Sequence, residues 1–191
     1  TNGDPDTSKI DQEKYKWLEF YKIKFKGSWY TRLFDKLVLR THAEFGFLGA
    51  YNNDRGVIPF DRFYLGGDGM SQYAMDGREM ISLRGYPNQS LSSQNGSTIY
   101  NKFSLELRYP ITLKPAASIF GLTFLESGQG FDNFRDYNPF NSKRSMGVGL
   151  RIFMPAFGLL GIDFGYGLDG VNNNDLTPNG WETHFVIGQN F

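Results

Sequence analysis

The residues that could carry out catalysis in this chain are few and lie far apart. There is no cysteine, and the two histidines are His42 and His184. A metal site would need one of these histidines with clustered carboxylates, and no ligand spacing of that kind occurs. A serine–histidine lipase stays an alternative, but no Gly-x-Ser-x-Gly turn is present and nothing places a serine beside either histidine. We therefore expect no enzyme activity, no metal and no cofactor.

Two glycine-rich stretches resemble ligand-binding loops but lack the residues that binding would need. Residues 66–69 read Gly-Gly-Asp-Gly, and no Walker lysine or helix follows in the register of a phosphate cradle. Residues 169–175 read Asp-Gly-Val-Asn-Asn-Asn-Asp, with valine at the third position and without the glycine and distal glutamate of a calcium loop. The second stretch is typical of an exposed turn.

Arg84 is the charged residue of most interest, because of the segment in which it lies. It falls inside a connection at about residues 50–97, and loops longer than about 12–15 residues are usually functional or disordered. Aromatic residues and glycines throughout this segment favour a packed excursion with special backbone angles. If the segment folds inward, Arg84 loses water and needs carboxylates as partners. Glu106 on a polar strand face and Glu126 at a strand end are the carboxylates to consider.

The elements that would position these residues are strands, because apolar and polar residues alternate with period two. The alternation is clear over residues 21–26, 36–47, 102–109, 145–154, 161–168 and 184–191. A seventh segment, 116–126, is less regular, and its pattern does not say which face is apolar. Tight connections near 31–35, 111–115 and 155–158 alternate with long ones near 50–97, 128–143 and 169–180. Small turns at one end and large loops at the other are typical of a transmembrane β-barrel.

The composition is consistent with a transmembrane β-barrel and excludes some classes of partner. Eighteen Phe, eleven Tyr and three Trp make 17% of the chain, a surplus that the aromatic girdles of a membrane barrel would use. The formal charge is zero, so nucleic acid is not expected as a partner. The chain has no apolar run long enough for a membrane-spanning helix, and residues 1–9 are polar rather than signal-like. A soluble sugar-binding β-domain is the alternative class, and it would dissolve without detergent.

Glycines repeat on the polar face of the late strands. Gly147 and Gly149 lie on one strand, and Gly161, Gly165 and Gly167 lie on the next. Glycine weakens a strand interior and often marks a close approach of another backbone. We expect this face to leave room for a second chain segment.

Seven strands do not close a barrel of the ordinary bacterial kind, which has an even number of strands from eight upward. An open sheet in lipid would leave two unpaired edges. The chain is therefore expected to be the C-terminal portion of a larger barrel, or to pair with another copy.

An ordered set of motifs resembles the BamA/TamA superfamily of outer-membrane assembly proteins. Phe63, Tyr64, Leu65, Gly66 and Gly67, followed by Leu83, Arg84, Gly85 and Tyr86, are similar to the family's sixth extracellular loop. Three later stretches are similar to the strand after that loop, to a late hairpin and to the closing strand: 105–110, 149–158 and 184–191. Two positions depart from the family pattern, Met154 before the hairpin proline and Leu159 after its glycine.

The resemblance implies that residues 1–191 form the last seven strands of a sixteen-stranded antiparallel transmembrane barrel with a lumen-inserted loop. It implies that Arg84 meets Glu106 and Glu126. It also assigns a closing strand with a terminal signal, carried by Phe185, Ile187, Gly188 and Phe191. The first barrel strands and the periplasmic domains would lie outside this chain.

The function implied by the resemblance is the folding and insertion of β-barrel proteins into the outer membrane of Gram-negative bacteria, through a lateral seam at the closing strand. The implied partners are the lipid bilayer, unfolded outer-membrane proteins and accessory assembly lipoproteins. A porin-like barrel, a secretion pore for one partner protein and a barrel fused to a soluble enzyme domain remain alternatives.

Overall fold

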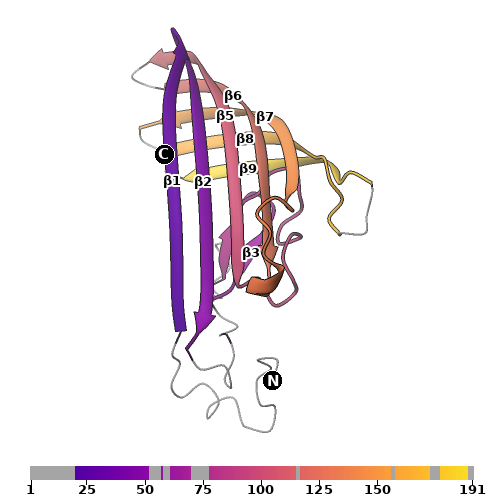
Figure 1. Ribbon diagram of the computed structural model, residues 1–191. Helices are drawn as coiled ribbons and strands as arrows, with labels where there is room; N and C mark the ends of the chain where they lie inside the picture. Colours follow the sequence, from indigo (N-terminus) through magenta and orange to yellow (C-terminus); the bar gives the residue numbers. More distant parts are fainter. Residues whose placement is uncertain are drawn as a thin grey trace.

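The computed structural model describes residues 20–51, 57, 61–69, 78–114, 117–155, 158–172 and 177–188. Seven long strands form one antiparallel sheet in the order β1-β2-β5-β6-β7-β8-β9 (Figure 1). Their bounds are β1 Phe20–Phe34, β2 Leu37–Ala50, β5 Ile99–Lys114, β6 Ala117–Phe131, β7 Lys143–Met154, β8 Gly158–Gly167 and β9 Gly180–Gly188. The all-β antiparallel fold expected from the alternation is thus confirmed. Among the described residues, no helix is long and apolar enough to cross a membrane.

The connections alternate between tight turns and long loops, with the tight turns at the upper end in Figure 1. The strands nevertheless run further than the alternation predicted. β1 continues to Phe34 and β5 to Lys114, so the expected turns at 31–35 and 111–115 are mostly strand. Main-chain pairing does not depend on a polar–apolar pattern, and a register shift near each of these turns lets the ladder continue past the point where the pattern fades.

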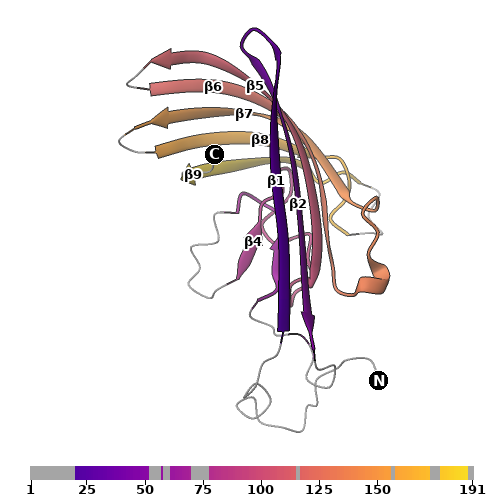
Figure 2. The same ribbon diagram turned by 60° about the vertical axis from the view of Figure 1, so that its left-hand side comes forward.

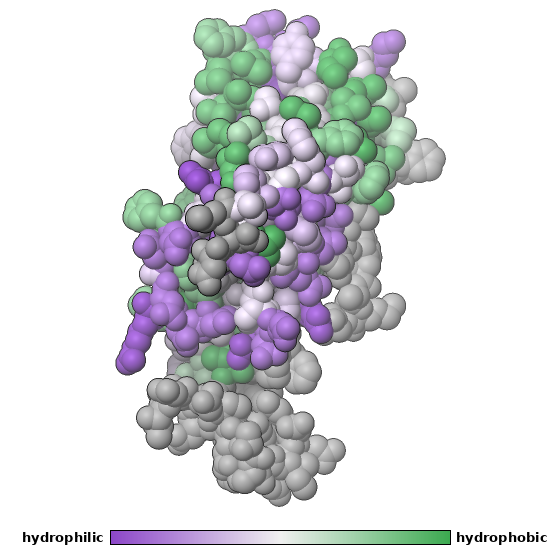
Figure 3. Space-filling model, turned by 90° about the vertical axis from the view of Figure 1, so that its right-hand side faces the viewer, coloured by the Kyte–Doolittle hydropathy of each residue, from purple (hydrophilic) through white to green (hydrophobic). Residues whose placement is uncertain are grey.

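The two faces of the sheet differ in polarity, as period-two alternation requires. Apolar side chains of the convex face are exposed, among them Leu105, Leu107, Leu125, Val148, Phe164 and Ile187. Charged side chains of the concave face are buried, among them Glu106, Glu126, Arg151 and Asp163. Figure 3 shows hydrophobic residues gathered over the half of the molecule near the tight turns and hydrophilic residues below them, over the long-loop half.

The face assignment of β6, which the sequence left open, follows from its burial pattern. Leu122 and Phe124 are buried on the concave face, while Thr123 and Leu125 are exposed on the convex face. On the concave face, Phe124 packs beneath the guanidinium of Arg84. This apolar residue on the otherwise polar face is what made the alternation of β6 ambiguous.

The long connection between β2 and β5 packs against the concave face (Figure 2). Its described part contains two short strands that the sequence did not predict, β3 Phe63–Leu65 and β4 Glu79–Ile81, which pair in parallel. Strands of three residues are too short to show a periodic signal. The main hydrophobic core lies between this connection and the sheet, and its buried members are Leu48, Phe63, Leu65, Ile81, Leu83, Tyr86, Leu91 and Tyr100.

The connection between β6 and β7 lies on the opposite, convex side of the sheet (Figure 2). It contains the short helix η2 Phe134–Asp136. The ring of Tyr137 packs 6.0 Å from Phe47 and 5.3 Å from Phe131, measured between ring centroids. Asn101, on the outward row of β5, is buried here and donates a hydrogen bond to the Pro139 carbonyl. Both faces of the sheet therefore carry packed connections near their long-loop end.

Candidate functional site

Arg84 lies buried on the concave face and contacts carboxylates from three strands. Its Nη2 donates to Glu106 Oε1 of β5 and Glu126 Oε1 of β6, each at 2.6 Å, and its Nη1 donates to Asp163 Oδ2 of β8 at 3.2 Å. The guanidinium carbon also stands 3.7 Å from the ring centroid of Phe124, a cation–π arrangement. The arginine therefore has both charge partners and an apolar platform.

Several cations around Arg84 share the same carboxylates. Arg151 donates to Asp163 through two hydrogen bonds of 2.6 Å, and Arg108 donates to Glu106 at 2.6 and 2.9 Å. Buried charges are tolerated where they are paired and hydrogen-bonded. Burial by itself lowers the pKa of Arg84, but Glu126, Glu106 and Asp163 raise that pKa above its ordinary value. Arg84 is therefore charged at ordinary pH.

Residues 83–86, here called the Arg84 motif, are also hydrogen-bonded to the sheet through their main chain. The Arg84 N–H donates to Glu126 Oε2 at 2.9 Å, and the Gly85 N–H donates to Nε2 of His184 on β9 at 2.8 Å. The Gly85 carbonyl accepts a hydrogen bond of 3.0 Å from the Asn179 side chain. With these bonds, both main-chain groups of Gly85 find side-chain partners from the C-terminal part of the sheet.

Tyr86 completes the motif by reaching β7. Its hydroxyl donates to the Arg144 carbonyl at 2.7 Å and accepts a hydrogen bond of 3.3 Å from the Asp169 N–H. Burial raises the pKa of Tyr86 to about 12. The neutral phenol, which can both donate and accept, is thus the form present at ordinary pH.

Glycines on both sides explain how the loop approaches the wall so closely. Gly85 has φ +87°, and a Cβ there would lie 2.9 Å from the Cβ of Ser145. On the facing strand, a Cβ at Gly165 would lie 2.6 Å from the Gly85 nitrogen, and one at Gly167 would also collide with Gly85. The expected room for another chain segment is found at Gly165 and Gly167, where that segment is the Arg84 motif. At Gly147, Gly149 and Gly161 the space is taken by the side chains of Phe124, Asp163 and Arg151.

The motif that precedes Arg84 in the sequence lies in the same packed loop. Phe63 and Tyr64 are buried in β3, and the Phe63 ring packs 4.6 Å from Tyr100 between centroids. Gly66 and Gly67 follow with φ of +114° and +81°. The Gly67 N–H and carbonyl both pair with Leu83, at 3.1 and 3.0 Å, so this motif holds the chain next to Arg84 in register.

The expected closing-strand residues fall on β9, the last strand of the sheet. Phe185 and Ile187 are exposed on the convex face. Gly188 pairs with Leu159 and has φ +136°, a backbone angle that other residues rarely adopt, although its surroundings are open. Phe191, the expected terminal signal, lies outside the described residues.

The family model of the Omp85 superfamily domain matches residues 9–191, which is nearly the whole sequence. The chain belongs to the Omp85 superfamily. The comparison with curated proteins returned no match.

A solved structure with the same fold is the crystal structure of BamA from Haemophilus ducreyi lacking POTRA domains 1–3. The match has a TM-score of 0.63 and 18% sequence identity, and it covers 88% of this chain. It covers 35% of the BamA chain, so this sequence spans about a third of the length of that structure. The Omp85 sheet described above therefore has the fold of part of a BamA barrel.

Several members of this site were not among the expected site residues: Asp163, Arg151, His184, Arg108, Asn179 and Phe124. In the sequence, Asp163 and Arg151 are polar positions of alternating strands. A usable signal was present, because Asp163 is the one carboxylate among the glycines of the polar face at 161–167. His184 had been considered for metal and lipase chemistry, and instead it accepts a backbone hydrogen bond. Within the described ranges, no three His, Asp or Glu side chains are grouped so that they could hold a metal ion.

Proposed function

We propose that this chain is the C-terminal section of an outer-membrane barrel that folds and inserts other β-barrel proteins. In this proposal β9 forms one side of a lateral seam, and its free edge offers main-chain hydrogen bonds to an incoming strand. Strand addition of that kind gives affinity with little demand on sequence. The proposal is supported by membership of the Omp85 superfamily and by the fold shared with BamA.

The observation that carries the proposal is the contrast between the two edges of β9. One edge pairs with β8 from Gly180 to Gly188, and within the described part of the chain the other edge, like the outer edge of β1, has no partner strand. An unpaired edge is normally a liability that proteins cover. Here it belongs to a strand that is fixed from inside, because His184 accepts the Gly85 hydrogen bond.

The Arg84 motif would act as an internal brace for the wall behind the seam. Three consecutive residues contact five strands: Arg84 reaches β5, β6 and β8, Gly85 reaches β9, and Tyr86 reaches β7. A wall braced in this way can keep its shape while one edge exchanges partners. The function needs no covalent chemistry.

The proposed partners follow from the same picture. The exposed apolar convex face would contact the bilayer of the bacterial outer membrane. Unfolded outer-membrane proteins would be the substrates. The nine earlier strands of a sixteen-stranded barrel and periplasmic domains that bind accessory lipoproteins would lie elsewhere in the full protein.

Site-specific photo-crosslinking tests the seam. A benzophenone amino acid is placed at Ile187 on β9 or at Val148 on β7, two convex-face positions with exposed fractions of 53% and 54%. During insertion of a β-barrel substrate by the full-length protein, Ile187 should give substrate adducts and Val148 should not. Equal amounts of adduct at Ile187 and Val148 would mean that the substrate contacts the convex face in general and does not pair with the edge of β9. A conductance with no insertion activity would favour the porin-like alternative instead.

A further inference from the structure

A groove of about 910 Å³ runs along the convex face beneath the loop between β6 and β7. This volume lies in the range of small-molecule binding sites. The groove is separate from the Arg84 site, which is on the other face of the sheet. Its position is at the long-loop end, where the exposed apolar rows of the strands stop and the polar loops begin.

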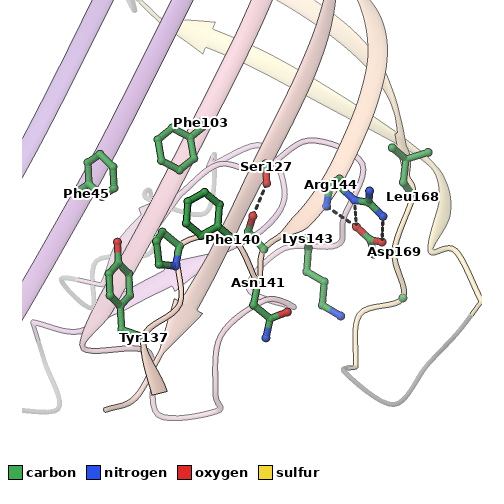
Figure 4. Close-up of a pocket in the computed structure, with 13 residues that line it drawn as sticks. Phe45, Phe103, Ser127, Tyr137, Phe140, Asn141, Lys143, Arg144, Leu168 and Asp169 are labelled. Atoms are coloured by element: carbon green, nitrogen blue, oxygen red, sulfur yellow. Dashed lines mark hydrogen bonds and ion pairs between the residues drawn. The ribbon is translucent and has the colours of Figure 1, made fainter. Parts of the chain in front are cut away.

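One end of the groove is aromatic. Phe45 of β2 and Phe103 of β5 form its floor, with ring centroids 5.3 Å apart in an edge-to-face arrangement. Tyr137 and Phe140 come from the overhanging loop, and Figure 4 shows these four rings gathered on the same side of the groove. The Phe140 side chain is 94% exposed, so it is free to cover an apolar chain lying along the wall.

The other end of the groove is cationic. Lys143 donates to the Asn172 carbonyl at 3.3 Å and makes no ion pair within the described part of the chain. Arg144 pairs with Asp169 at 2.8 Å, and its side chain is 66% exposed (Figure 4). Two cations against one carboxylate leave this end with one net positive charge.

The overhang is attached to the wall rather than lying loosely over it. The Ser127 hydroxyl of β6 hydrogen-bonds with the Ser142 hydroxyl, and Asn101 donates to the Pro139 carbonyl. These bonds fix the loop on both sides of Phe140. The space between the loop and the strands is therefore a built groove with an apolar end and a cationic end.

We propose that this groove binds a phosphate-bearing lipid from the leaflet on the long-loop side. The acyl chain lies on Phe45 and Phe103 under Phe140, and the phosphate meets Lys143 and the exposed face of Arg144. The aromatic floor of the groove favours an acyl chain, because it continues the apolar rows of the convex face. The net positive charge at the other end favours a phosphate, which is negatively charged. The inference uses the proposed placement of the sheet in a membrane and does not depend on insertion activity.

Native mass spectrometry of the detergent-solubilised full-length protein tests the site, with dimyristoyl phosphatidic acid and dimyristoyl phosphatidylcholine as probes. Lys143→Gln should raise the Kd for phosphatidic acid about fivefold, the factor that corresponds to one lysine at an anionic membrane surface. It should raise the Kd for phosphatidylcholine by less, because the choline of that lipid already offsets the charge of its phosphate. Phe140→Ser should weaken both lipids, because its contact is with the acyl chain.

Matched controls lie at the opposite rim of the sheet. Lys114 and Phe34 are exposed next to the tight turns, so Lys114→Gln and Phe34→Ser should leave both Kd values unchanged. Equal effects of the Lys114 and Lys143 variants, or equal binding of the two lipids by the wild type, would overturn the site. Displacement of the lipid by inorganic phosphate would show a free-anion site instead. Insertion activity, measured on the same variants, reports separately on the proposed function.

Discussion

Replacing Arg84 by methionine removes a buried cation while keeping much of the volume of its side chain. The Arg84 side chain is 8% exposed, and the side chains of Glu106, Glu126 and Asp163 are 4%, 2% and 0% exposed. Removing one partner of a buried ion pair costs about 3–5 kcal/mol, because the remaining charge stays buried. Surface ion pairs contribute only about 0–1 kcal/mol. Because all four side chains are buried, the Arg84 variant belongs in the higher range.

The cost is not shared equally among the three carboxylates. Glu106 and Asp163 each keep another arginine at 2.6 Å. Among the described cations, Glu126 keeps Lys102 at 3.6 Å, and its neutral donors, the N–H of residue 84 and the Ser104 hydroxyl, remain. We therefore expect Arg84→Met to destabilise the protein by about 3 kcal/mol, the lower end of the range, with the loss concentrated on Glu126.

A double-mutant cycle with Glu126→Gln checks this assignment in the full-length protein. Each single variant should lower the free energy of unfolding in urea, and the double variant should lose at least about 1 kcal/mol less than the sum, because no uncompensated charge remains. Exchange of the Gly85 amide should rise roughly 100-fold in Arg84→Met if the local loss is about 3 kcal/mol. Far-ultraviolet circular dichroism should show unchanged strand content. Strictly additive losses, or wild-type exchange at Gly85, would refute the bracing argument.

Two further changes test the contact between the loop and the wall. In Gly165→Ala the new Cβ would lie 2.6 Å from the Gly85 nitrogen, so the loop should be displaced and become sensitive to limited proteolysis, with a loss of about 1–3 kcal/mol. Gly121→Ala is the matched control, because its nearest neighbour is a side chain 3.8 Å away, and wild-type sensitivity of both variants would contradict the close approach. His184→Ala removes the acceptor of the Gly85 N–H and should cost about 1–3 kcal/mol, with faster exchange of that amide. Unchanged exchange would mean that the closing strand is not coupled to the loop.

The seven strands could be predicted from the sequence because alternation is a local property. Leu105, Leu107 and Val148 face outward on the period that their neighbours set. Strand ends were less accurate, since main-chain pairing continues after the alternation stops, as it does at Phe34. The β3–β4 pair was missed because its hydrogen bonds join segments that are separated in the sequence and short in themselves.

The Arg84 site was predictable in part for a related reason. The need for carboxylates follows from burying a cation, the strand positions of Glu106 and Glu126 made them candidates, and the family resemblance implied that Arg84 meets them. Asp163 and His184 lie 79 and 99 residues away from the motif they contact, and only the sheet order brings them near it. The glycines at 165 and 167 did indicate that a segment would approach there, but not which one.

The lengths of the strands and the contacts of the loop lead to one mechanical picture. From β5 to β9 the strands shorten in order, with 16, 15, 12, 10 and 9 residues. Each residue pair lost from a ladder removes hydrogen bonds, so within the described residues the β8–β9 ladder has fewer main-chain pairs than the β5–β6 ladder. Short edge strands also limit unwanted pairing. The contacts of Arg84, Gly85 and Tyr86 reach all five strands from the concave face, and within the described residues they leave the outer main-chain edge of β9 without a partner strand. Under the proposed function, the Arg84 motif would supply the stability of the wall and β9 would supply the edge that an incoming strand pairs with.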